Sequence, residues 1–148
     1  MKRTTSERSG EDRKATVACV TDQFQCERII RAGRSIANLT DTSLLVINVS
    51  PIDSTAQSGE AIEHLFRISQ QNDAEMSVFY SEKTLKVLTT FIKKNHAVNV
   101  VTGMPQQQNS VLSKMWSKLG GVSFFTVDAS GEFVHVPLKD GGEIARRV

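Results

Sequence analysis

The sequence predicts an α/β fold with an open, mainly parallel five-stranded sheet in the order 3-2-1-4-5, helices on both faces and a C-terminal hairpin strand. Three observations support this class. Short apolar runs alternate with amphipathic segments at helical spacing, which is typical of a parallel sheet covered by helices. The runs are apolar at successive positions, as in strands that are buried on both faces. Because connections between parallel strands of one sheet are right-handed, only a few strand orders are possible.

The first half of the chain contains three predicted strands and two predicted helices. The strands are residues 15–20 (ATVACV), 44–49 (LLVINV) and 75–80 (EMSVFY). Residues 25–39 form the first helix, and Pro51 stops the second strand before a polar loop and the second helix. The apolar positions of these two helices are Ile29, Ile30, Gly33, Ile36 and Ala37, and then Ile62, Leu65 and Phe66.

A third helix, a fourth strand and a fourth helix follow. Ser81 is the predicted N-cap of the third helix. Residues 98–102 form the fourth strand, and the loop after it opens at Gly103 and leads to a helix that starts near Ser110. A pair of glycines at 120–121 ends that helix. The apolar faces of the two helices are Leu85, Leu88, Phe91 and Ile92, and then Val111, Leu112, Met115, Trp116 and Leu119.

The last two strands form a predicted hairpin. Residues 122–127 (VSFFTV) are the fifth strand, and residues 132–136 (EFVHV) turn back on it through Ser130 and Gly131. Such a strand leaves an apolar edge that needs cover. We therefore predict a homodimer through the last strands; the alternative is a monomer whose hairpin closes its own sheet. The apolar residues of this edge are Phe124, Phe125, Phe133, Val134 and Val136.

The length of 148 residues fits one domain, placed at residues 15–138 between a leader at 1–14 and a polar tail at 139–148. The leader has no large apolar side chain after Met1 and is expected to be disordered. It carries the whole net charge of +2, so the remaining chain is electrically balanced and gives little support for nucleic-acid binding. No apolar run reaches the ~18 residues of a membrane span, so no membrane insertion is expected.

The cysteines and histidines argue against a disulfide framework, a metal site and nucleophilic catalysis. Two cysteines are too few for a framework and favour a cytoplasmic protein. Cys19 is a predicted core residue, and Cys26 lies near a helix start, where a structural role is preferred over a reactive one. His64, His96 and His135 lack partners at ligand spacing. No nucleophile elbow or Walker motif occurs, so no catalytic residue is predicted.

The predicted strand order places a ligand crevice at the carboxyl ends of the first and fourth strands, where the order reverses. Two loops meet there, at residues 21–25 and 103–110. A glycine that opens a strand-to-helix loop allows a phosphate to meet backbone N–H groups at a helix N-terminus. Gly103 and Ser110 occupy these positions.

The first strand and helix, VACVTDQFQCERIIRAGRSIANL, resemble the universal stress protein (Usp) family, and most closely the Usp-like domain of KdpD-type sensor kinases. In those kinases a CV(S/T) strand end leads through a short polar loop to an R-x-I-R-A-(G/A)-R-x-(I/L)-A helix. The order and content of the elements extend the resemblance over residues 15–127. The matching residues are Cys19, Val20, Thr21, Arg28, Ile30, Arg31, Ala32, Gly33, Arg34, Ile36 and Ala37.

The resemblance implies a nucleotide site that this chain has partly lost. ATP-binding Usp proteins carry G-x2-G-x9-G-(S/T) after the fourth strand. Aligned on Gly103, this chain has Gln106 and Trp116 where the second and third glycines belong, followed by Ser117; a different gap makes Ser110 the Ser/Thr of the motif. Glycine permits positive φ and a close approach of backbone to phosphate, which Gln and Trp obstruct.

The function that the resemblance implies is a Usp-like signalling or stress-response module with a degenerate nucleotide site. It is expected to act by ligand sensing or by contact with a signalling protein, without catalysis. The alternative is an adenine-nucleotide-binding protein for ATP, AMP or cyclic di-AMP, and nucleotide hydrolysis is a weaker one. Family members often place an aspartate like Asp22 near the nucleoside; its other interpretation is a helix N-cap. The candidate binding residues are Thr21, Asp22, Gly103, Ser110 and Val111.

Overall fold

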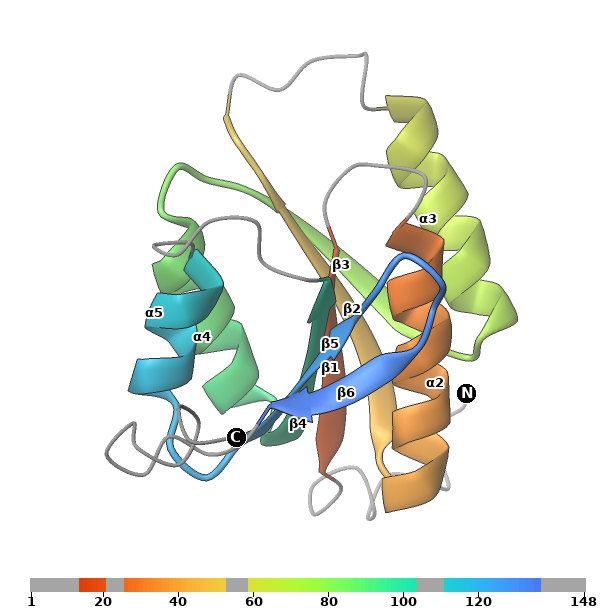
Figure 1. Cartoon of the computed structure of the whole chain (residues 1–148). Helices are drawn as coiled ribbons and strands as arrows, with labels where there is room; N and C mark the ends of the chain where they lie inside the picture. Colours follow the sequence, from red (N-terminus) through yellow and green to blue (C-terminus); the bar gives the residue numbers. More distant parts are fainter. Residues whose placement is uncertain (1–13, 21–25, 53–58, 104–110, 137–148) are drawn as a thin grey trace, which may run out of the picture.

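The computed structural model describes residues 14–20, 26–52, 59–103 and 111–136, so the predicted leader (apart from Lys14) and the predicted tail lie outside it. The described strands form one six-stranded sheet in the order β3-β2-β1-β4-β5-β6 (Figure 1). Only the β5–β6 pair is antiparallel. The predicted fold class is confirmed. The strands are β1 (Ala15–Val20), β2 (Ser43–Ser50), β3 (Glu75–Tyr80), β4 (Ala97–Gly103), β5 (Ser123–Val127) and β6 (Phe133–Val136).

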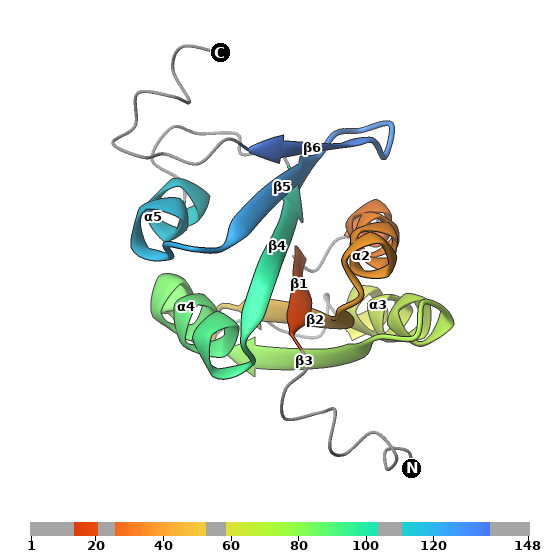
Figure 2. The ribbon, with the colours of Figure 1, turned by 90° about the horizontal axis from the view of Figure 1, so that it is seen from below.

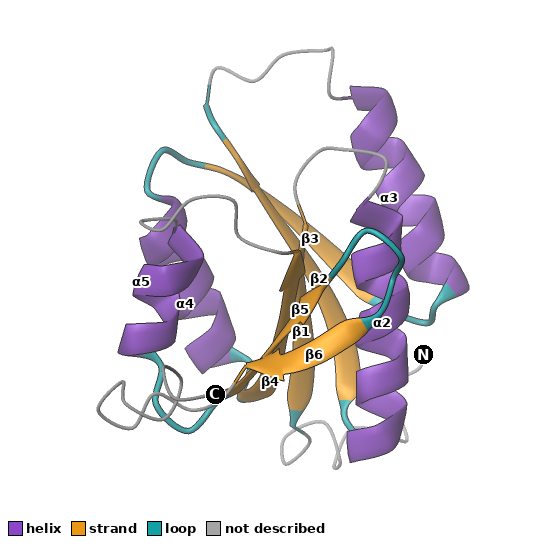
Figure 3. Ribbon diagram, viewed as in Figure 1, coloured by secondary structure: helices purple, strands orange, loops and turns teal. Residues whose placement is uncertain are grey.

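Two described helices cover each face of the sheet. Figure 2 shows α2 (Glu27–Thr40) and α3 (Gly59–Gln71) on one face and α4 (Thr84–Lys94) and α5 (Val111–Lys118) on the other. Each helix follows a parallel strand and leads back to the next one (Figure 3). The helices therefore start at the carboxyl end of the sheet and finish at its amino end. None of the helices in the described ranges is long and apolar enough to cross a membrane.

The strands send alternate side chains into two apolar clusters. In β1, Ala18 and Val20 belong to the cluster under α2 and α3, whereas Val17 belongs to the cluster under α4 and α5. Cys19 packs against that second cluster, which agrees with its predicted place in the core. Burying an aliphatic side chain contributes about 1.5–3 kcal/mol, so these clusters supply the main stabilisation. The largest buried side chains include Ile30, Ile36 and Leu65 in the first cluster and Ile47, Ile92 and Met115 in the second.

A glycine lets α2 approach the sheet closely. A Cβ added at Gly33 would lie 2.9 Å from Leu44 Cδ1 and 3.5 Å from Ala18 Cβ. A larger side chain would therefore push the helix away from β1 and β2. This explains why a residue of low helix propensity stands on the buried face of α2.

Two local features differ from the sequence-based expectation. The N-cap of α4 is Lys83, whereas the hydroxyl of the predicted cap Ser81 accepts a hydrogen bond from the Lys83 N–H at 2.9 Å. Ser81 thus forms a local turn before the helix. At the last strands, Phe124 is buried, and Phe133 packs edge-on against Phe125 with ring centroids 6.0 Å apart. Of the five predicted edge residues, Val134 is the one that remains largely exposed.

Candidate functional site

The carboxyl ends of β1 and β4 form the topological switch point of the sheet. β1 pairs with β2 on one side and with β4 on the other, and the crossovers from these two strands go to opposite faces. Open α/β sheets bind ligands in the crevice that this reversal creates. Of the predicted site residues, Thr21, Asp22 and Ser110 lie outside the described residues. The structure places Gly103 at the end of β4 and Val111 at the start of α5.

Gly103 lies half-buried next to the first turns of α2. A Cβ at this position would lie 3.4 Å from Ile29 Cδ1, and β4 holds Gly103 beside Val127 of β5. Among the described glycines, only Gly121 and Gly131 have positive φ. The backbone conformation therefore does not require glycine at 103. What the residue provides is a close approach between the end of β4 and Ile29 of α2, where an added Cβ would already be in contact.

Asn48 of β2 is a polar side chain that holds the carboxyl end of β1 in place. It is fully buried in β2, and its Nδ2 donates a hydrogen bond to the carbonyl oxygen of Val20 at 3.1 Å. The hydroxyl of Ser50 donates in turn to Asn48 Oδ1 at 2.7 Å. Val20 is the last residue of β1, so this pair of bonds fixes the point from which the chain enters the predicted site loop. Sequence reasoning missed Asn48, although an asparagine inside an apolar strand is an unusual choice.

The first turns of α2 add charged groups near the same end of the sheet. The Arg28 Nε donates to the carbonyl oxygen of Asp128, directly after β5, at 2.8 Å. The Glu27 carboxylate pairs with Arg31, and His64 Nε2 of α3 lies 3.3 Å from Glu27 Oε1. These contacts connect α2 to β5 and α3. The Arg28–Asp128 contact lies one residue beyond Val127, the partner of Gly103 in the sheet.

Asp128 shapes the turn between β5 and β6. Its Oδ1 accepts hydrogen bonds from the Ser130 hydroxyl at 2.7 Å and from the N–H groups of Ser130 and Glu132 at 2.9 and 3.0 Å. The Ser130 hydroxyl and then the Glu132 N–H lower the pKa of the Asp128 carboxyl below its ordinary value. Gly131 supplies the positive φ that the turn needs. The side chain of Asp128 thus has a structural task, while its carbonyl oxygen faces Arg28.

The described part of the chain holds one strongly shifted thiol and an imidazole ring that stacks on an aromatic side chain. Burial raises the pKa of the Cys19 thiol to about 12, so this thiol stays protonated at neutral pH. The His135 ring packs against Phe125 with centroids 4.9 Å apart. Within the described ranges, no three His, Cys, Asp or Glu residues lie close enough together to hold a metal ion.

A six-stranded sheet whose strand order reverses between β1 and β4, parallel except for its last strand, defines the class of doubly wound α/β domains. A universal stress protein from Archaeoglobus fulgidus has this fold: it matches with a TM-score of 0.61 and 16% identity, over 74% of this chain and 90% of that one. The universal stress protein from the same organism in complex with dAMP matches with a TM-score of 0.57 and 16% identity, over 74% and 94%. No protein-family model matches the chain, and no curated protein matches its sequence. At this identity the likeness establishes the Usp fold.

Proposed function

We propose that this protein is a Usp-like module of signalling or stress response that senses an adenine nucleotide and does not catalyse a reaction. The observation that carries the proposal is the reversal of strand order between the carboxyl ends of β1 and β4, where Gly103 ends β4 and the hydrogen bond from Asn48 holds the end of β1. The structural neighbour in complex with dAMP supports the choice of an adenine nucleotide. A chain with two cysteines, too few for a disulfide framework, fits the cytoplasm as its compartment.

The start of α5 is the place where we expect the phosphate to bind. The helix begins at Val111, and its first turn contains no acidic residue that would repel an anion. The first N–H groups of a helix have no partner within the helix and carry a partial positive charge. In this proposal Ser110 adds a hydroxyl, and Thr21 and Asp22 contact the nucleoside. Because Gln106 replaces a glycine of the family motif, we expect a monophosphate to bind better than ATP.

Gly103→Val is expected to weaken adenine-nucleotide binding at least about tenfold, a free-energy change of about 1.4 kcal/mol. The valine would project toward Ile29 and fill the space beside the end of β4. Titration calorimetry with AMP, dAMP, ATP and cyclic di-AMP, with and without magnesium, measures the change in Kd. Phosphate release in the same mixtures separates sensing from hydrolysis.

Gly120→Ala is the matched control for this experiment. Gly120 follows α5 near the amino end of the sheet, and no atom lies within 4 Å of a Cβ added there. The control should keep the wild-type Kd. The same Kd in Gly103→Val would remove Gly103 from the site, and no binding of any of the four nucleotides at millimolar concentration would overturn the sensing proposal.

The second candidate function is a protein-interaction module that dimerises through β6. Among the described strands β6 pairs only with β5, so its outer edge is open, and the Val134 side chain is 61% exposed. A second copy of the chain could cover both features, as the family resemblance implies.

Val134→Asp is expected to convert a dimer to a monomer, because it places a charge at the centre of the proposed interface. Light scattering coupled to size exclusion measures the mass. Phe133→Asp is a poorer test, since Phe133 packs against Phe125 within the same chain. Leu39→Asp, at an exposed apolar residue of α2, is the control and should keep the wild-type mass. A dimer that persists in Val134→Asp would place the interface elsewhere.

A further inference from the structure

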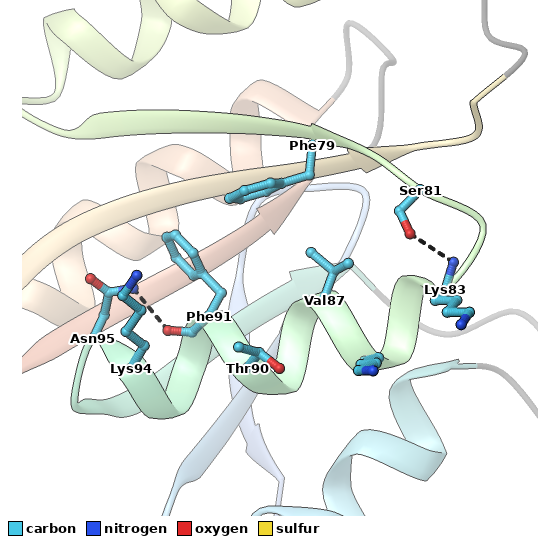
Figure 4. A pocket seen from close by; sticks show the side chains of 9 residues that line it. Phe79, Ser81, Lys83, Val87, Thr90, Phe91, Lys94 and Asn95 are labelled. Carbon is cyan, nitrogen blue, oxygen red and sulfur yellow. Dashed lines mark hydrogen bonds between the residues drawn. The ribbon is translucent and has the colours of Figure 1, made fainter.

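A groove between the end of β3 and α4 lies on a different part of the molecule from the crevice. Its volume is about 510 Å³, within the range of small-molecule sites, and none of the residues discussed above for the crevice lines it (Figure 4). Most of its lining comes from one face of α4, at positions three or four residues apart. The lining residues are Phe79, Ser81, Lys83, Lys86, Val87, Thr90, Phe91, Lys94 and Asn95.

The floor of the groove is apolar and aromatic. The rings of Phe79 and Phe91 meet edge to face, with centroids 6.0 Å apart and planes at 69°. Val87 continues this surface toward the start of α4 (Figure 4). Phe79 is 39% exposed, so a large part of its ring is open to a ligand. An aromatic body placed here would add ring contacts in the geometry that aromatic pairs prefer.

The rim of the groove is positively charged. Lys83 and Lys86 lie at the N-terminal end of α4 and Lys94 at its C-terminal end, and no acidic residue lines the groove. Within the described part of the chain, no carboxylate forms an ion pair with any of the three lysines. The neighbouring Glu82 uses its Oε2 to accept the Ile52 N–H at 2.9 Å, on the loop after β2. Three ammonium groups around an apolar floor, with no acidic residue among the lining residues, favour an anionic ligand.

We propose that this groove binds a small organic anion with an apolar or aromatic body, whose acidic group pairs with Lys83 and Lys86 and whose body rests on Phe79, Val87 and Phe91. A peptide that extended the sheet would run along the whole of β3. The groove instead contacts β3 only at Phe79, near its carboxyl end. This placement favours a compact ligand over an added strand. The proposal does not depend on nucleotide binding at the crevice.

The test compares two probes of the same shape and different charge, 2-naphthoate and the neutral 2-naphthylmethanol, by titration calorimetry on the full chain. We expect naphthoate to bind one site and the alcohol to bind about tenfold more weakly, because a charge-assisted hydrogen bond contributes more than one to a neutral hydroxyl. Naphthoate affinity should also fall as salt is raised. Equal affinities for the two probes, or no binding of naphthoate at millimolar concentration, would overturn the proposal.

Variants locate the site. The double change Lys83→Gln and Lys86→Gln should reduce naphthoate affinity about tenfold, since both lysines are exposed and their loss removes charge without removing core packing. Lys93→Gln is the matched control, because Lys93 is an exposed lysine of α4 that does not line the groove. Equal loss in the control and the double variant would indicate non-specific attraction and overturn the assignment. Changes in the NMR chemical shifts of the backbone amides along all of β3, including Glu75 and Met76, would instead indicate a ligand that pairs with the strand. They would contradict the proposed pose.

Discussion

Asn48→Asp is expected to lower the free energy of unfolding by about 2–4 kcal/mol at neutral pH, because it buries a negative charge and replaces the amide donor of Asn48 with a second acceptor. In the wild type, Asn48 Nδ2 donates to the Val20 carbonyl oxygen at 3.1 Å. The aspartate would place a carboxylate oxygen against that carbonyl, so two acceptors would face each other in a fully buried position. Only the bond from the Ser50 hydroxyl could persist. Urea denaturation at pH 7 measures the loss.

The change should also weaken nucleotide binding, because Val20 is the residue from which the chain leaves β1 toward the proposed site. Burial raises the pKa of a carboxyl group. Lowering the pH would therefore protonate the introduced carboxylate in the folded state before the unfolded state takes up the same proton. Protonation would restore a donor and reduce the deficit relative to the wild type.

The control is Asn38→Asp on the exposed surface of α2. There the side-chain oxygen accepts a hydrogen bond from Arg34 Nε at 3.1 Å, and a carboxylate can accept the same bond. Its unfolding free energy should stay within about 0.5 kcal/mol of the wild type. If Asn48→Asp kept the same unfolding free energy as this control, the buried hydrogen bonds of Asn48 would make no measurable contribution to stability.

The fold could be predicted because every element has its own periodic pattern. The apolar runs, the helical spacing and the turn at Ser130 and Gly131 are local signals, and the right-handed crossover rule converts them into a strand order. The boundaries agree within a few residues; β2, for example, is predicted at residues 44–49 and spans Ser43–Ser50. The end of the sheet that should hold a ligand follows from this topology alone.

The details of the crevice and the groove could not be predicted, because they depend on pairs of residues distant in sequence. The apolar pattern places Asn48 in a strand but does not predict its hydrogen-bond partner. That partner, Val20, lies 28 positions away in the sequence. Phe79 and Phe91 belong to different elements, and only the packing of α4 beside β3 brings their rings together. Of the predicted site residues, Thr21, Asp22 and Ser110 lie outside the described part of the chain and stay predictions.

A second buried asparagine, Asn99, allows loss of stability to be separated from loss of the site. Its Nδ2 donates to the hydroxyl oxygens of Thr16 and Thr40, both at 3.0 Å, and the Thr16 hydroxyl lies 2.6 Å from that of Thr42. These groups are at the amino end of the sheet, opposite the crevice, because Thr16 and Asn99 are near the starts of β1 and β4. These hydrogen bonds connect the C-terminal end of α2 to the sheet.

Asn99→Ala is expected to lower the free energy of unfolding by about 2–3 kcal/mol, through two lost hydrogen bonds and the cavity that the smaller side chain leaves. Its Kd for an adenine nucleotide should nevertheless match the wild type at a temperature where both are folded. Asn48→Asp has a comparable effect on stability and lies at the crevice, so its Kd should rise under the same conditions. If the two variants lost affinity equally, lowered stability alone would explain the loss, and the nucleotide site could no longer be assigned to the ends of β1 and β4. A rise in Kd for Asn48→Asp alone would tie binding to the end of β1 that Asn48 holds in place.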